Sequence, residues 1–413
     1  MTWPCISFPE TVRKPDVGRE NQIPASEIKS SGRFPVIDQG QSFISGYSNE
    51  EARLIKNDLP LIIFGDHTRV VKFVDFPFIL GADGTKVLKP REDRFDARFF
   101  AFALQSFDLP SRGYNRHFTL LKERSVPRPE LPEQRKIAGV LGMVQRAMEQ
   151  QERLLALTAE LKKALLRQLF THGLRHEPQK QTELGFVPES WNAATLGALA
   201  CKPDGFLQTG PFGSQLHKHD YLCEGVGVVN PTHLWGNQIN HEDVPRVSSE
   251  TAARLERHRL EAGDILFARR GEIGRHGMVT EKEEGWLCGT GCFLARVRQK
   301  HIDNRFLSYF FSTPGSIAWL NSHAAGAIMP NLNNTVLRSM PVFFPKLGIQ
   351  KEIADCLDST GRKFGIHYRK HAALSALFRT LLHELMTARI CVHNLDLTAF
   401  GITVGNPEQP AGS

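Results

Sequence analysis

The sequence lacks the features of a membrane, secreted or disulfide-stapled protein. No apolar run approaches the roughly eighteen residues that span a bilayer, and residues 1–15 lack the apolar core of a signal peptide. Seven cysteines occur, an odd number without a C-x-x-C pair, which argues for reduced thiols rather than a disulfide framework. The sequence therefore predicts a cytoplasmic protein with no membrane partner.

Motifs for nucleotide binding or catalysis are also missing. There is no G-x-x-x-x-G-K-[ST] phosphate loop and no G-x-G-x-x-G after a predicted strand. Residues 230–233 (Asn-Pro-Thr-His) lack the second proline and the aromatic residue with which adenine methyltransferases clamp a flipped base. His217, His219 and Cys223 are metal-ligand types without a fourth ligand at a suitable spacing. We therefore expect no catalytic residue, and no metal or cofactor bound by this chain.

The most informative feature that is present is a long-range repeat. Residues 134–171 return without a gap as residues 350–387, with twelve of 38 aligned positions identical. Apolar residues at steps of three and four predict a helix of roughly 57 Å in each copy, which suits a coiled coil. The apolar positions expected to make its contacts are Ile137, Leu141, Leu161, Leu165, Leu169, Ile353, Leu357, Leu377, Leu381 and Leu385. Coiled-coil composition alone pairs some leucines, but the shared Gln-x-x-Ile-Ala start favours duplication.

Each predicted long helix follows a globular block of mixed α/β (α+β) character. In the first block, strand-like runs lie at residues 34–37, 61–64, 70–74 and 78–80, and a helical run lies at 95–106. In the second block, strand-like runs lie at residues 226–229, 265–268, 277–279 and 292–297. The blocks also share an Asp-x-Arg-Phe corner, at Asp96 and at Asp303. The sequence therefore predicts a tandem duplication with segments at 1–128, 129–175, 176–346, 347–390 and 391–413.

Net charge is +7 and the pI is about 9.0, but the excess lies in the helices. Residues 131–175 hold eight Lys/Arg and four Asp/Glu, and residues 347–393 hold seven and four. Any DNA contact by the blocks must therefore come from local clusters, where Arg, Asn, Gln and Lys bond to base edges. The candidate DNA-binding residues are Asp66, His67, Arg69, Arg112, Tyr114, Asn115, Arg116, Gln215, His217, Lys218, Arg269, Arg270, Arg275, Asn331 and Asn333. For any single loop, the alternative is ordinary polar surface.

Several short motifs together resemble one known family over nearly the whole chain. They are Leu131-Pro132-Glu133-Gln134-x-x-Ile137-Ala138, Leu161-Lys162-x-x-Leu165-Leu166-x-x-Leu169-Phe170-x-x-Gly173, Gly185-x-Val187-Pro188-x-x-Trp191, Gly210-Pro211-Phe212-Gly213-Ser214, Gly263-Asp264-Ile265-Leu266 and Pro330-Asn331-Leu332-Asn333. In this combination the chain resembles the specificity subunits of type I restriction-modification systems.

The resemblance implies two target-recognition domains joined by two long antiparallel coiled-coil helices in a pseudo-twofold tandem repeat. Each domain would read one half of an asymmetric, bipartite site in double-stranded DNA. The chain would be non-catalytic and would dock two modification (methyltransferase) subunits, which bind S-adenosylmethionine, and through them the ATP-driven restriction subunits, where Mg is also expected. Two alternatives stay open, a coiled-coil scaffold that binds proteins and a stand-alone DNA methyltransferase or nuclease with degenerate motifs.

Two departures from the family pattern give further expectations. The block before Gln134 is shorter than the block between Trp191 and Gln350, so the first domain is expected to be smaller or to lack its start. The second long helix carries Gly361 and Gly365, with two histidines at positions where a heptad calls for apolar residues. It is expected to be kinked or partly covered by another subunit.

Overall fold

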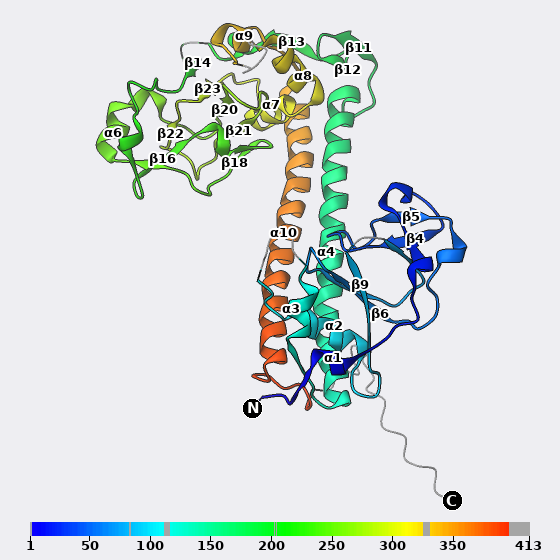
Figure 1. Ribbon diagram of the computed structural model, residues 1–413. Coiled ribbons are helices and arrows are strands. Elements are labelled where there is room, and N and C mark those ends of the chain that lie inside the picture. The colour runs from blue at the N-terminus through cyan, green and yellow to red at the C-terminus, as the bar shows by residue number, and fades with distance from the viewer. Residues whose placement is uncertain are drawn as a thin grey trace, which may run out of the picture. The chain divides into compact units, whose positions relative to one another are not determined.

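The computed structural model describes residues 2–81, 84–110, 116–201, 203, 205–324 and 331–395 (Figure 1). The chain divides into two compact units, Met1–Arg153 with Tyr368–Ser413, and Leu154–His367. Each unit contains one globular block and part of both long helices, α4 (Leu131–His172) and α10 (Leu347–Met386). The architecture mixes helix and sheet, which confirms the predicted fold class. No described helix is both long and apolar enough to cross a bilayer.

Unit 1 is built on two four-stranded sheets and one strand pair. The antiparallel sheet has the order β2-β9-β6-β7, with β2 (Val12–Arg13), β9 (Thr85–Pro90), β6 (Leu61–Gly65) and β7 (Val71–Val74). The mixed sheet has the order β3-β8-β4-β5, with β3 (Gln22–Ile23), β8 (Ile79–Gly81), β4 (Phe34–Ile37) and β5 (Gly46–Ser48). The remaining elements are β1 (Cys5–Ser7) paired with β10 (Ser125–Pro127), and the helices α1 (Phe8–Thr11), α2 (Ala97–Gln105) and α3 (Phe118–Lys122).

Unit 2 repeats this plan with longer connections. Its antiparallel sheet has the order β14-β23-β20-β21, with β14 (Phe206–Thr209), β23 (Cys292–Arg296), β20 (Ile265–Ala268) and β21 (His276–Met278). Its mixed sheet has the order β15-β19-β16-β22, with β15 (Tyr221–Leu222), β19 (Arg246–Val247), β16 (Val226–Val229) and β22 (Leu287–Cys288). The other strands are the hairpins β11 (Gln179–Thr182) with β12 (Gly185–Pro188) and β17 (Leu234–Trp235) with β18 (Gln238–Ile239), and the pair β13 (Asn192–Thr195) with β24 (Pro341–Phe344).

Four shorter helices of unit 2 contribute to its main core, and α6 (Ser249–Arg254) packs in a separate, smaller cluster. The four are α5 (Leu196–Leu199), α7 (Asn304–Phe311), α8 (Pro314–His323) and α9 (Asn334–Ser339). Each strand-like run predicted from the sequence overlaps an observed strand, and the predicted helical run at 95–106 contains α2. All seven cysteines are free, as the sequence predicts.

One buried glutamine in each half has an equivalent role, which accounts for the identity of Gln134 and Gln350 in the repeat. The Gln134 side chain accepts from Asp96 N at 2.9 Å and donates to two carbonyls, at Arg94 and at Pro129. Gln350 makes the same three bonds, to Asp303 N and to the carbonyls of His301 and Pro345. Both glutamines are fully buried. Because the aspartates they bond also cap α2 and α7, each glutamine fixes its long helix to its own block.

The long helices pack in opposite directions within each unit. In unit 1, Ile137 and Leu141 near the start of α4 share a core with Leu385 near the end of α10. In unit 2, Leu357 near the start of α10 shares a core with Leu169 near the end of α4. This confirms the antiparallel arrangement. Ile353 is likewise buried, and Leu165 and Leu381 are partly buried.

The predicted apolar contact is nevertheless not continuous. Leu161 is 50% exposed and Leu377 is 45% exposed, so the expectation that Leu161 is buried against the other helix is wrong for the chain alone. The reason is that leucines near the helix ends pack against a globular block, whereas those farther along lie beyond it. The two glycines of α10, Gly361 and Gly365, do not interrupt it, because α10 runs as one helix through both. His371 contacts Glu152 at 3.0 Å.

Candidate nucleic-acid interface

In unit 2 the fold brings two predicted DNA-binding loops together. The strand β20 is buried throughout and ends at Ala268, after which the chain emerges at Arg269 and Arg270. The Arg269 carbonyl accepts a hydrogen bond from Leu332 N at 2.9 Å, and Arg270 forms a β-bridge with Asn331. Side chains more than sixty positions apart in sequence therefore lie at one edge of the unit. Arginine and asparagine together offer the donors and acceptors that purine edges require.

The side chains at this edge are incompletely satisfied. Arg270 is exposed. The guanidinium of Arg269 lies 6.0 Å from the centre of the Phe293 ring. Among the described residues, Arg269 Nε and Asn331 Oδ1 are buried without a hydrogen-bond partner, and each such group costs about 1 to 3 kcal/mol. Native proteins seldom retain such groups without a functional reason, so this edge is suited to a ligand rich in donors and acceptors.

The loop that follows Arg270 is shaped by two glycines. Gly271 and Gly274 have φ values of +82° and +95°, which side chains rarely adopt, so the turn depends on glycine. Within it, Arg275 pairs with Glu272 at 2.5 Å. His276 lies just beyond, fully buried between the carbonyls of Gly274 and Ser308, and burial lowers its pKa. The buried His276 ring therefore links the end of this loop to the Ser308 carbonyl of α7.

Sequence reasoning missed Trp235, which lies beside this loop. Trp235 is 72% exposed, and the Arg275 guanidinium lies 5.9 Å from the centre of its ring. It ends β17, and the hairpin turns through Gly236 and Asn237, both with positive φ. The Gly-Asn pair after the apolar residues Leu234 and Trp235 was the available signal, because such pairs favour two-residue hairpin turns. An exposed indole stabilised by a cation is suited to stacking on a base or sugar.

The other predicted residues of unit 2 are only partly available. Gln215 accepts from Phe212 N at 3.1 Å and so closes its own turn. His217 and Lys218 are exposed, and the His217 ring stacks on His219 at 5.2 Å. Asn333 caps α9 by accepting from Val336 N at 2.8 Å. Its amide NH₂ group is left for another partner.

In unit 1 the predicted residues have mixed outcomes. Asp66 is 2% exposed, accepts from Phe118 N at 2.8 Å and lies 3.8 Å from Lys86. The expectation that Asp66 contacts DNA is therefore wrong, because its carboxylate holds α3 against the end of β6. His67 is partly buried, and its backbone N–H donates to the side chain of Gln39.

The two described arginines of this region differ in the contacts of their side chains. Arg69 adopts a φ of +63° and donates to the Leu109 carbonyl at 2.6 Å. Arg116 is exposed. The predicted residues Arg112, Tyr114 and Asn115 lie outside the described residues, so their roles stay predictions.

Residues 230–233 form a short helical turn that is closed by a side-chain hydrogen bond. Pro231–His233 is a single helical turn, and the His233 ring accepts from Asn230 N at 3.0 Å. Burial lowers the pKa of His233.

A cavity of about 1460 Å³ lies next to the β17–β18 hairpin and reaches Arg305 and Asp358. These two side chains pair with each other at 3.0 Å, and Lys282, Lys300 and Lys351 also line the cavity.

Comparisons with known proteins find one matching domain family and several similar proteins. Residues 233–376 match the family model of the type I restriction modification DNA specificity domain, a span that contains Trp235, the 269–275 loop and Asn331. The type I restriction enzyme MjaVIII specificity subunit of Methanocaldococcus jannaschii is 24% identical over 279 residues, 66% of this chain and 63% of that subunit's length. The type I restriction enzyme EcoBI specificity subunit of Escherichia coli is 23% identical over 337 residues, 76% of this chain and 68% of that subunit.

A solved structure shares the fold. The S subunit of a type I restriction-modification system from M. genitalium superposes with a TM-score of 0.64 at 16% identity, covering 93% of this chain and 96% of that one. In sequence, the chain is thus similar to type I restriction enzyme specificity subunits, through the matched domain and the curated relatives. In fold, it is similar to a solved S subunit.

Proposed function

We propose that this chain is the non-catalytic, DNA-reading subunit of a type I restriction-modification complex. Unit 2 reads one half of a bipartite DNA site through Arg269, Arg270 and Asn331, with Trp235 and Arg275 beside them. Unit 1 reads the other half, with Arg69 and Arg116 among its contacts. Modification subunits bind S-adenosylmethionine, and restriction subunits bind ATP and Mg, so that the chemistry takes place on other chains.

One observation carries the proposal. The matched specificity domain contains an edge at which Arg269, Arg270 and Asn331 are brought together by backbone bonds, with two buried polar atoms left unpaired. A base edge supplies both an acceptor for an arginine and a donor for an asparagine oxygen. The scaffold and stand-alone enzyme alternatives find no support, since the matched domain and both named relatives belong to specificity subunits.

The exposed apolar residues of the helices fit a docking role. Leu157 and Leu161 lie one turn apart on α4 and are 52% and 50% exposed. Two large aliphatic side chains on one helical face are unfavourable in water and are typical of a surface that another chain covers. We assign this face of unit 2 to the modification subunit.

The test is methylome sequencing of cells that carry the chain with its modification subunit. A bidentate arginine–guanine pair contributes about 1 to 3 kcal/mol of discrimination, about 5- to 160-fold. Arg270→Ala should relax one base position in one half-site and leave the other half-site unchanged. Arg175, an exposed arginine of unit 2 far in sequence from the loops, provides the matched control, and Arg175→Ala should leave the site intact.

Binding measured against salt separates the possible outcomes. Equal loss on every sequence, with a shallower salt slope, would make Arg270 a phosphate contact. Unchanged methylation in Arg270→Ala and in Arg269→Ala would remove this edge from the recognition site. An assembled complex without salt-dependent DNA affinity would favour the scaffold, and S-adenosylmethionine binding by the isolated chain would favour the stand-alone enzyme.

A further inference from the structure

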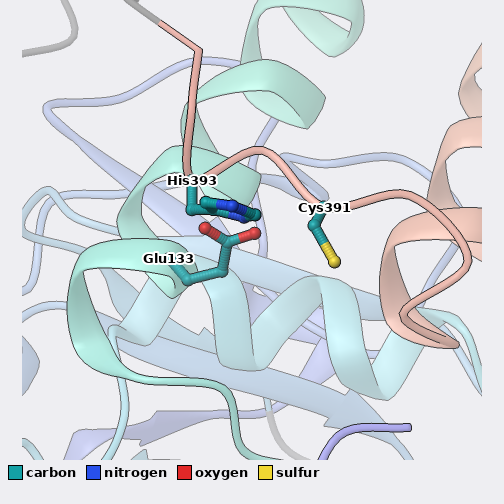
Figure 2. A group of neighbouring side chains, drawn as sticks. All are labelled: Glu133, Cys391 and His393. Carbon is teal, nitrogen blue, oxygen red and sulfur yellow. The ribbon is translucent and has the colours of Figure 1, made fainter. Parts of the chain in front are cut away.

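Three side chains of metal-ligand type meet in unit 1, on segments other than those that carry the predicted DNA-binding residues. Glu133 lies in the first turn of α4, whereas Cys391 and His393 lie on the segment that follows α10. One ligand atom from each, a carboxylate oxygen, the thiol sulfur and a ring nitrogen, lies within 4.8 Å of the others. Figure 2 shows Glu133 reaching toward His393, with Cys391 beside them. Residues separated by about 260 positions thus form one cluster.

The cluster is held in place by bonds that leave one ligand atom unused. Glu133 is 7% exposed, and its Oε1 accepts from Val392 N at 2.7 Å. Its Oε2 is buried, and among the described residues it has no hydrogen-bond partner. A first-turn carboxylate is favoured by the helix dipole, but that role and the bond to Val392 require no second oxygen. A buried, unpaired carboxylate oxygen is costly unless a cation or donor meets it.

Lys136, the neighbouring cation, does not bond to the unpaired Oε2 of Glu133. Lys136 Nζ donates to the carbonyls of His393 and Leu395, at 2.5 and 3.0 Å. Its ammonium group therefore holds the segment through the backbone. Val392, which lies between Cys391 and His393 in the sequence, is 2% exposed. The segment that carries Cys391 and His393 is thereby anchored on α4 independently of any ion.

The set of donors selects the class of ion. A thiolate, an imidazole and a carboxylate form a mixed S/N/O set that suits Zn²⁺ and Co²⁺, whereas Mg²⁺ and Ca²⁺ prefer oxygen alone. The thiolate and the carboxylate carry two negative charges, which a divalent cation neutralises. Bond lengths of about 2.0 to 2.3 Å place tetrahedral ligands roughly 3.3 to 3.7 Å apart. The side chains must therefore close by about 1 Å, a change that rotation of exposed His393 can supply.

We propose that Glu133, Cys391 and His393 bind one zinc-class divalent cation, which fastens the segment after α10 to the first turn of α4. Three protein ligands leave a fourth position for water. The site departs from the sequence expectation that the chain binds no metal, an expectation that considered only His217, His219 and Cys223. It does not depend on the proposed DNA-reading function.

The experiment uses the full chain, reduced, freed of any histidine tag and stripped of metal, then titrated with Co²⁺ and back-titrated with Zn²⁺. We expect one Co²⁺ per chain, a sulfur-to-cobalt charge-transfer band in the near ultraviolet, and loss of that band on addition of one equivalent of Zn²⁺. Cys391→Ser should abolish the band, and His393→Ala and Glu133→Gln should each weaken binding at least tenfold. Cys223→Ser, which removes an exposed thiol elsewhere, should bind as the unaltered chain does.

Glu133→Gln keeps the oxygen that accepts from Val392 N, so it tests the ligand without removing the anchor. A second measurement guards against misfolding: Zn²⁺ should raise the melting temperature of the unaltered chain and leave that of Cys391→Ser unchanged. Failure of the unaltered chain to bind Co²⁺ at micromolar concentration would overturn the proposal. So would a band that survives in Cys391→Ser or disappears in Cys223→Ser, because the ion would then be bound by other thiols.

Discussion

Replacement of Gln350 by alanine tests how each long helix is fixed to its block. Gln350 is fully buried and makes three hydrogen bonds, at 2.9, 2.9 and 2.8 Å, to Asp303 N and to the carbonyls of His301 and Pro345. Gln350→Ala leaves all three backbone groups without this partner. At about 1 kcal/mol of net stabilisation for each bond, the loss is about 3 kcal/mol. For a unit of this size that lowers the melting temperature by about 6 to 12 °C.

The assay is thermal and urea unfolding combined with hydrogen exchange read by mass spectrometry. In Gln350→Ala, protection should fall around residues 301–306 and 345–350. In Gln134→Ala it should fall around residues 94–99 and 129–134, because Gln134 makes the equivalent bonds. Gln181, an exposed glutamine of unit 2, is the matched control. Equal melting temperatures for Gln350→Ala and Gln181→Ala, with unchanged local protection, would refute the reasoning.

Leu169→Ala should lower the free energy of unfolding by about 2 to 5 kcal/mol, because Leu169 is buried in the core of unit 2. Leu161→Ala, at a half-exposed site, should lower it by less than about 0.5 kcal/mol. Urea denaturation compares the two variants, and equal losses would contradict the assigned burial. Leu161→Asp should instead weaken binding of the modification subunit in a pull-down. Burial lowers the pKa of His233, His258 and His276, so the unfolded chain takes up protons first and stability falls as pH drops below about 6.5. Melting temperatures from pH 7.5 to 5.5 should show this fall, less steeply in His258→Phe, and identical slopes would argue against it. Asn333→Ser keeps an α9 cap but loses the amide donor, so base discrimination should drop at an unchanged melting temperature; unchanged discrimination would remove Asn333 from the interface.

The sequence by itself determined the repeat, the long helices and half of the strands in the four-stranded sheets. These features depend on local spacing, namely apolar steps of three and four in helices and short apolar runs in strands. Gly173 illustrates such a local signal, because glycine is favoured just after the end of a helix and Gly173 follows α4 with a φ of +68°. The identity of Gln134 and Gln350 was likewise visible in the sequence, although its cause was not.

The tertiary structure decided which of these residues are free to act. Asp66 and Arg69 are neighbours in one polar loop, yet packing buries the first and leaves the second exposed. Leu161 and Leu169 share one helical stripe, but only Leu169 meets a globular core. Burial depends on what the rest of the chain places against a residue, which local spacing does not encode.

Clusters built from distant segments were beyond sequence reasoning for the same reason. Arg269 meets Leu332, and Glu133 meets Val392. The local spacing of residues does not predict such pairs, because each partner follows only the pattern of its own helix or loop. Their proximity arises when the sheets and helices pack, and it is packing that sets which charges and ligand atoms face one another.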